Sequence, residues 1–493
     1  MIRSERESQN RSSNDSAAPT IRLAEVISSL SFALDLTEGQ AMGHSVRACI
    51  IAMHIGEEIR LTPEELGDLY YASLMKDAGC STNSSRMYQI LGTDDIKAKR
   101  DVKVTDWTRL NWESLSYAIS HVQTGAPFLE RVRAIVDVAQ NQKRTAKELV
   151  TMRCERGSFI ARRIGLSENS ASAIHSLDEL WSGAGQPTGL CREEIPVLSR
   201  VMNLSQNLEV FYSTFGPVAA LEMARVRSGR WFDPSLVAAF ESISKRGKVW
   251  DDVDHSSDRI AGMEPTEQHL VADPDTLDSI CLAFADVIDA KSPFTFRHST
   301  GVAGAAVAIA RTLELSEQEV TTIRRAALLH DIGKLSVPNS ILDKPGKLTN
   351  DEWQVVKKHP YYSFEILKKV PGFTEISEIA ASHHEKLDGS GYFRGQDGDQ
   401  MPLSARILVV ADIYDALAAK RPYRDALPLE TVFEIIAKDA PKALDAQCFE
   451  ALKCSTDSAS AITRDLLKLA LSVRTETVAD EQTVGADRVG MTA

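Results

Sequence analysis

The sequence predicts an all-α protein built from two tandem copies of one helical domain. Apolar residues recur at i, i+3 and i+4 spacing along most of the chain, whereas the alternation typical of strands is scarce. Two blocks of the sequence also match later blocks in the same order. At 493 residues, the chain is longer than one compact core usually supports, which favours two or three domains.

Local signals place individual helices. "SEQEVTTIRRAALLHDIG" has helical periodicity and opens with Ser316 as a plausible N-cap. "LTPEELGDLYYASLMKDAG" opens with Thr62 as cap, Pro63 at the first helical position and Glu65 at the third. Both segments are therefore expected to be helices.

The repeat is visible as two ungapped alignments. Residues 43–81 match 297–336 at a constant offset, and residues 179–201 match 385–407 at a smaller one, so the first copy carries an insertion of about 48 residues. The paired residues are His44 with His298, Leu61 with Leu315, Asp77 with Asp331, Gly79 with Gly333, Glu179 with Glu385, Gly183 with Gly389, Gly185 with Gly391, Pro196 with Pro402 and Arg200 with Arg406.

Composition completes the outline of the domains. Both chain ends are polar and low in apolar residues, and the stretch around 243–276 is polar and broken. The predicted order is a disordered N-terminus (1–19), a first helical domain (20–242), a linker (243–276), a second helical domain (277–474) and a disordered tail (475–493).

Charge and cysteine content narrow the functional classes. The net charge is −13 with a pI near 5.4, which argues against a general binder of nucleic acids or membrane surfaces. The first twenty residues lack the apolar core of a secretory signal, and the longest clean apolar run is too short to span a bilayer. The seven cysteines are odd in number and lack CxxC spacing, so we expect free thiols in the cytoplasm.

The second copy holds a cluster of candidate metal ligands. A single histidine on a helix is more often a surface or hydrogen-bonded core residue, but here five of the eleven histidines fall between 298 and 384. Imidazole and carboxylate together suit a transition metal, and Asp331 is the natural bridge between two ions. The candidate ligands are His298, His330, Asp331, His359, His383, His384 and Asp412.

The ordered motifs of the second copy resemble the HD superfamily of metal-dependent phosphohydrolases and, within it, the HD-GYP subfamily. The motifs are His298, "HDIGK" (330–334), "HP" (359–360), "HHEKLDGSGYF" (383–393) and "ARILVVADIYDALAAKRPYR" (405–424). The resemblance implies two tandem HD-type domains, the second of them an HD-GYP catalytic domain. It also implies a phosphodiesterase that opens cyclic di-GMP to pGpG, in some members on to GMP.

The resemblance assigns roles residue by residue. It implies that the seven candidates ligate metal, with Asp331 bridging, and that Asp331 and Lys334 are the catalytic residues. Two ions about 3.5–4 Å apart can activate a water and clamp phosphate oxygens, which is what phosphodiester hydrolysis needs. We expect two divalent ions, Fe or Mn first, with Ni, Co or Zn open. The residues implied to contact substrate are Lys334, Gly391, Tyr392, Asp415, Arg421 and Arg424.

Two positions depart from the family pattern. Phe393 stands where the signature has proline, which leaves the loop less rigid and bears on partner contacts more than on catalysis. Phe294 stands where some members carry a glutamate that helps bind a third metal. We therefore expect two metals and pGpG as the main product.

The first copy has lost most of the ligand set. Lys76 and Arg153 stand opposite His330 and His359, and cationic side chains repel metal ions instead of binding them. We therefore predict a degenerate HD-like domain without metal, with either a sensory, regulatory or dimerising role or a purely structural one. The remaining changed positions are Cys80, Leu177, Asp178 and Gln206.

Two alternatives stay open. The chain could hydrolyse another cyclic dinucleotide or nucleotide, or it could be a non-catalytic signalling protein that binds cyclic di-GMP or partner proteins. Protein partners would use the loop around "GYF" (391–393) or the N-terminal domain, and a homodimer is left open.

Overall fold

The structure is a computed structural model that describes residues 21–106, 112–265, 270–295, 297–419 and 425–457. The expected all-α fold is confirmed, because the pairing of extended segments within these ranges is limited to isolated bridges. The two terminal segments that the sequence predicts to be disordered, 1–19 and 475–493, lie outside the described residues.

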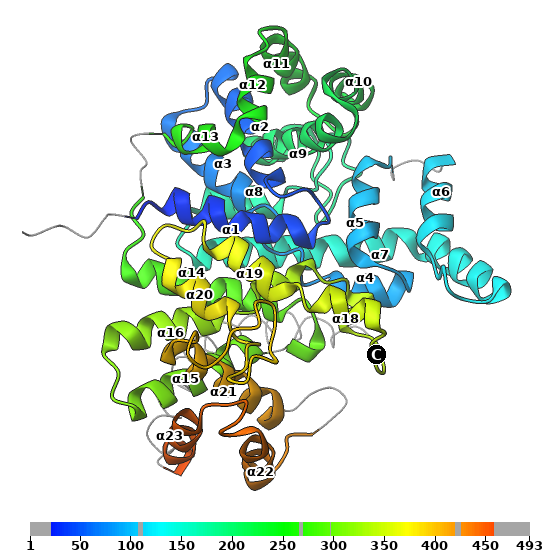
Figure 1. The fold of residues 1–493 in the computed structure, drawn as a ribbon. Helices are drawn as coiled ribbons and strands as arrows, with labels where there is room; N and C mark the ends of the chain where they lie inside the picture. The colour runs from blue at the N-terminus through cyan, green and yellow to red at the C-terminus, as the bar shows by residue number, and fades with distance from the viewer. Residues whose placement is uncertain (1–20, 107–111, 266–269, 296, 420–424, 458–493) are drawn as a thin grey trace, which may run out of the picture.

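The N-terminal half forms the upper part of the molecule in Figure 1. Its elements are α1 (Leu23–Thr37), α2 (His44–Glu58), α3 (Pro63–Met75), α4 (Ser84–Leu91), α5 (Asp95–Val104), α6 (Trp112–His121), α7 (Phe128–Arg163), α8 (Glu168–His175), η1 (Arg192–Glu194), α9 (Val197–Phe215), α10 (Pro217–Arg227), α11 (Pro234–Lys245), α12 (Lys248–Asp254), α13 (Ser256–Arg259) and η2 (Ile260–Gly262). Helices α4 to α7 extend to the right of the view.

The C-terminal half forms the lower part (Figure 1). Its elements are α14 (Pro274–Asp289), η4 (Pro293–Thr295), α15 (His298–Thr312), α16 (Glu317–Leu329), η5 (Ile332–Ser336), α17 (Asn339–Leu342), α18 (Asn350–Val356), α19 (His359–Leu367), α20 (Thr374–Ala381), α21 (Leu403–Ala418), α22 (Leu429–Asp439) and α23 (Ala446–Asp457). Helix α15 packs between α16 and α21, which brings the ligand-bearing segments to one place.

The same local contacts recur in the two halves. Asp35 accepts hydrogen bonds from the backbone N–H and the hydroxyl of Ser45, and Asp289 does the same with Ser299. Capping boxes begin α3 and α16 at matching positions, as the sequence signals predict. These contacts support the internal repeat, while the exact domain boundaries stay a prediction.

Buried contacts join the two halves. Helix α1 packs on η5 and α19 of the C-terminal half and crosses the middle of the molecule in Figure 1. The fully buried ammonium of Lys291 lies 2.9 Å from the carboxylate of Asp95, which also accepts the backbone N–H of Asn339. The halves therefore share a desolvated polar contact as well as a continuous apolar core.

The segment predicted as a linker is largely packed with the N-terminal half. Helix α12 contacts α2 and α11, and it buries Val249 and Val253. Trp250 stacks on Tyr212 with ring centroids 4.2 Å apart. Within the described ranges, no helix is long and apolar enough to cross a membrane.

Candidate metal centre

Separate segments of the C-terminal half bring the seven candidate ligands together. His298 begins α15, His330 and Asp331 follow α16, His359 begins α19, His383 and His384 follow α20, and Asp412 lies on α21.

A glycine allows two of these segments to meet. A Cβ on Gly333 would lie 2.0 Å from the backbone carbonyl oxygen of His359, so only glycine lets η5 approach α19 this closely. The Gly333 N–H donates to the hydroxyl of Ser363, which itself donates to the carbonyl oxygen of His330. The "HDIGK" turn and the "HP" helix are therefore held against each other by backbone contact.

Asp331 lies between two groups of imidazoles. Its Oδ2 is 3.3 Å from Nε2 of His330 and 3.7 Å from Nε2 of His298. Its Oδ1 is 3.3 Å from Nε2 of His359 and 3.5 Å from Nε2 of His383. Each oxygen of the carboxylate thus faces a different pair of histidines, which is the arrangement of a bridging ligand.

The rings are held with Nε2 turned inward. Nδ1 of His330, His359 and His383 each lies 2.6–2.7 Å from a backbone carbonyl oxygen three residues earlier. Nδ1 of His298 is instead 2.6 Å from the carboxylate of Asp415. Such partners fix the tautomer that leaves Nε2 as an electron-pair donor, as in protein metal sites.

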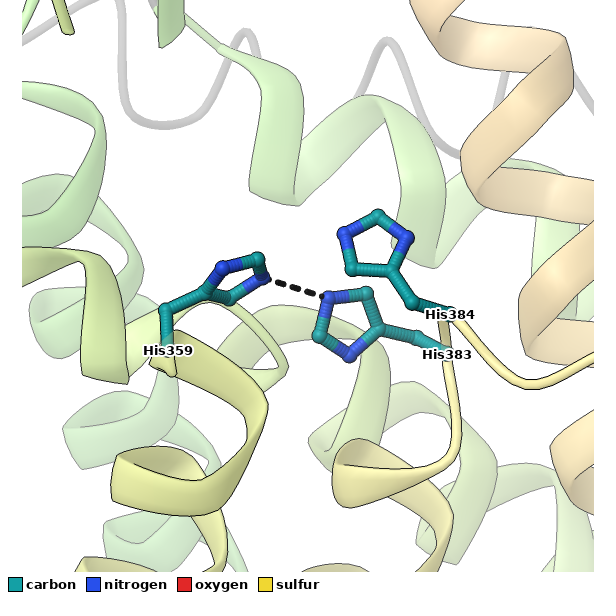
Figure 2. Close-up of side chains that lie close together, drawn as sticks. All are labelled: His359, His383 and His384. Atoms are coloured by element: carbon teal, nitrogen blue, oxygen red, sulfur yellow. Dashed lines mark hydrogen bonds between the residues drawn. The ribbon is translucent and has the colours of Figure 1, made fainter. Parts of the chain in front are cut away.

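The potential ligand atoms fall into compact sets. One set is His298, His330 and Asp412, another is His359, His383 and His384, and within each the ligand atoms lie within 4.8 Å of one another. Figure 2 shows the second set, in which Nε2 of His359 is 3.0 Å from Nε2 of His383 and the rings converge from two segments.

The donors fit metal ions on two further observations. Nε2 of His330 and Oδ1 of Asp331 are buried and have no hydrogen-bond partner in the described residues, although both could accept one. In addition, burial lowers the pKa of His359 to about 4 and also lowers the pKa of His383. Both are therefore neutral near pH 7, and only neutral imidazole binds metal.

The other side of the centre has the opposite electrostatics. Burial opposes the charged form of His298, but hydrogen bonds with Asp412 and Asp415 outweigh it and raise its pKa to about 10. Burial would also raise the pKa of Asp331, yet His330 and Lys334 hold it well below its usual range. Without metal, His298 is therefore protonated near pH 7 and balances the neighbouring carboxylates, and a metal ion bound there takes the place of that proton.

The remaining predicted site residues have mixed positions. Nζ of Lys334 lies 2.5 Å from Asp331 and is partly exposed. Tyr392 packs on His384, with ring centroids 4.8 Å apart. Gly391 adjoins Tyr392 and approaches the backbone of Glu385. Asp415 contacts Nδ1 of His298, the ring nitrogen that faces away from Asp331. Arg421 and Arg424 lie outside the described residues.

Two aromatic residues near the site were not singled out from the sequence. The Trp353 ring is 5.9 Å from the Tyr392 ring, and Tyr361 is 5.7 Å from Phe393. Trp353 and Tyr361 are both more than 40% exposed, which is unusual for large aromatic side chains. Exposure of these two rings is what marks them as candidate binding residues, and the sequence alone does not reveal it.

The matching place in the N-terminal half holds ion pairs. Lys76 contacts Asp77, and Nη2 of Arg153 lies 2.7 Å from Asp178. Nη1 of Arg153 is 3.9 Å from Glu38. These cations pair with carboxylates, but the ligand atoms of Glu38, Asp77 and Cys80 also lie within 4.8 Å of one another, so the absence of metal from this half stays a prediction.

Comparisons with known proteins agree with the geometry. The HD domain family matches residues 283–448. A relative from Vibrio cholerae, "3'3'-cGAMP-specific phosphodiesterase 3", is 42% identical over 439 residues, which cover 89% of this chain and 95% of that protein. A "cyclic di-GMP phosphodiesterase response regulator" from Xanthomonas campestris is 44% identical over 146 residues, or 29% of this chain and 39% of its own length. A solved structure of a cyclic GMP-AMP-specific phosphodiesterase of V. cholerae superposes with a TM-score of 0.61 at 36% identity, covering 89% of this chain and 98% of the other.

Proposed function

The chain belongs to the HD-GYP family of metal-dependent cyclic-dinucleotide phosphodiesterases, and from this premise we propose that it hydrolyses 3'3'-cGAMP to the linear dinucleotide. Water adds to one of the two phosphodiester phosphorus atoms, and the bond to one sugar oxygen breaks. The relative that matches both halves of the chain is named for this substrate.

Cyclic di-GMP, the substrate expected from the motifs, is the second candidate, with pGpG as its product. Its support is the Xanthomonas relative, which matches over 146 residues of this chain. The relative that extends over both halves carries the other substrate in its name, so we rank 3'3'-cGAMP first.

The position of Asp331 between two groups of imidazoles carries the proposal. We assign His298, His330, His359, His383, His384, Asp331 and Asp412 as ligands of two divalent transition metal ions, Fe or Mn first. When bound, such ions supply an activated water and neutralise phosphate charge.

The protein's own side chains have separate tasks. Lys334 lies beside Asp331 with its ammonium partly exposed, where it can neutralise charge on the phosphate or on the leaving oxygen. The exposed ring of Trp353, next to Tyr392, offers a flat surface on which a purine can stack. Trp353 is thus assigned to binding of a base, and Lys334 to neutralisation of phosphate charge.

The test is turnover by anaerobically purified protein, with metal content measured on the same sample. We expect about two ions per chain and hydrolysis of 3'3'-cGAMP. The double variant His330→Ala plus Asp331→Ala should lose both, whereas His255→Ala, a change at an exposed histidine, should lose neither. Unchanged hydrolysis by the double variant would refute the assigned centre.

A substrate panel separates the candidates. Values of kcat/KM for 3'3'-cGAMP, cyclic di-GMP and cyclic di-AMP should rank in that order. A higher value for cyclic di-GMP would overturn the substrate assignment but keep the reaction. Tight binding without turnover, with each of the divalent metals supplied, would instead support the non-catalytic alternative.

A further inference from the structure

The N-terminal half contains a cavity of about 700 Å³ at the place that corresponds to the metal centre of the other half. Arg153, Asp178 and Gln206 line it, and in the repeat alignment they stand opposite His359, His384 and Asp412. The cavity therefore lies over the residues that replaced the ligand set.

Helices α4, α5, α6 and α7 build the walls. These helices lie within or beside the inserted stretch of the first copy, at the right of Figure 1, and α9 completes the lining. Most of the lining is apolar; representative residues are Met87, Leu91, Ile135, Val138, Leu149 and Val210. Cavities of roughly 300–1,000 Å³ with such walls are typical of sites for small organic molecules.

The polar lining has an excess of positive charge. Lys99, Lys103 and Arg153 face two carboxylates, those of Glu38 and Asp178. Burial would raise the pKa of Glu38, but Lys103 and Lys99 outweigh it and hold the pKa at about 2. Glu38 is therefore ionised and is one of the two negative charges of the lining. The adjacent buried carboxylate of Asp77 also stabilises Lys103, but it is paired with Lys76, so this group of cations still outnumbers its carboxylates by one. An unbalanced charge is costly in a largely apolar space.

Two polar groups in the lining have unused hydrogen-bonding capacity. Nζ of Lys103 is buried, forms an ion pair with Glu38 at 3.0 Å and has no hydrogen-bond partner in the described residues. Oε1 of Gln206 is buried without a partner as well, on a residue that is 8% exposed. By contrast, Lys99 is satisfied by Ser84 and two backbone carbonyl oxygens.

We propose that this cavity binds a small amphipathic organic anion, with its apolar body between α4, α5 and α7 and its anionic head at Lys103. A carboxylate head balances the extra cation and accepts a hydrogen bond from Lys103. Oε1 of Gln206 can only accept a hydrogen bond, so it does not contact the anionic head. The site is separate from the metal centre, so the N-terminal half is a ligand-binding module.

The test uses the full-length protein and three probes with the same alkyl chain: dodecanoate, dodecan-1-ol and dodecyltrimethylammonium, each below its micellar concentration. Calorimetry should show one dodecanoate per chain. Because a hydrogen bond to a charged group contributes about 1.5–3 kcal/mol, dodecanoate should bind about 10–100-fold more tightly than the alcohol. The cationic probe should bind more weakly than either.

Two matched pairs of variants locate the binding. Val138→Trp fills the cavity and should abolish binding of every probe, whereas Val136→Trp, at an exposed position of α7, should not. Lys103→Met should remove the preference for dodecanoate over the alcohol, whereas Lys147→Met should keep it. Circular dichroism and thermal unfolding establish that each variant is folded.

Three results would overturn the proposal: no dodecanoate binding, equal affinity for the acid and the alcohol, or unchanged binding by Val138→Trp. A variant of the catalytic half, His330→Ala, separates the two sites. Its dodecanoate affinity should equal that of the unmodified protein, and a loss there would mean that the probe binds at the metal centre.

Discussion

Changing Asp415 to asparagine should weaken metal binding and leave substrate affinity intact. Oδ2 of Asp415 lies 2.6 Å from Nδ1 of His298, and its side chain is 14% exposed. Asparagine keeps the size and can still accept one hydrogen bond, but it loses the charge that strengthens the bond. Partners of this kind are worth about 10–100-fold in metal affinity, or roughly 1.4–2.7 kcal/mol.

The assay separates this role from the substrate contact implied by the family resemblance. Activity is measured against added Mn²⁺ and then against substrate at saturating metal. We expect a right-shifted metal curve, a KM within about two-fold of the original and recovery of most of kcat with excess metal. Asp439→Asn, an exposed change at the end of α22, is the control. A raised KM with an unshifted metal curve would refute the positioning role of Asp415.

Three further changes test other parts of the molecule. Lys334→Met should lower kcat by about 10²-fold with the metal content unchanged, because it removes a donor beside Asp331; a changed metal content by mass spectrometry would contradict that role. Asp95→Asn should lower the free energy of unfolding by about 3–5 kcal/mol in urea, because it leaves the Lys291 ammonium buried without a counter-charge; a loss under about 1 kcal/mol would argue against a desolvated pair. Glu209→Gln should make the free energy of unfolding fall less steeply in acid. Burial opposes ionisation of Glu209, but its partners hold the pKa at about 2, below the ordinary 4.5. The stabilisation that ionised Glu209 gives the folded protein is therefore complete above pH 4.5 and disappears as the pH falls towards 2. Identical acid-unfolding curves for the two proteins would exclude that contribution.

The sequence was most informative where the signal is local. The caps of α3 and α16 follow from residues three positions apart, and the structure shows both boxes closed. The all-α class follows from helical periodicity, which each helix carries within its own residues. The convergence of the candidate ligands was expected from motif order, and the structure brings them together around Asp331.

Orientation and long-range packing were beyond the sequence. The contact of Asp415 with His298 joins residues that are 117 positions apart, and spacing along the chain cannot reveal which atom a carboxylate faces. The polar segment after α11 looked like a linker, yet Val249 and Val253 are buried against neighbouring helices. The cavity likewise depends on where the inserted helices pack, which periodicity does not determine.

The two halves show two ways to keep a buried carboxylate charged. An isolated ionised carboxylate is costly away from water, so Asp77 and Asp331, at equivalent positions and both fully buried, each need cations. In the N-terminal half the cations are covalently attached: Lys76 contacts Asp77, and Lys103 and Arg153 help to hold its pKa below the usual range. In the C-terminal half Lys334 lies beside Asp331, and the neighbouring positions carry imidazoles whose Nε2 atoms face inward, as ligands do in protein metal sites. Lysine and arginine at these positions thus supply the charge that neutralises Asp77 from the protein itself. Both halves therefore pack around a buried acid at the same position of the repeat, each with a different set of neighbouring side chains.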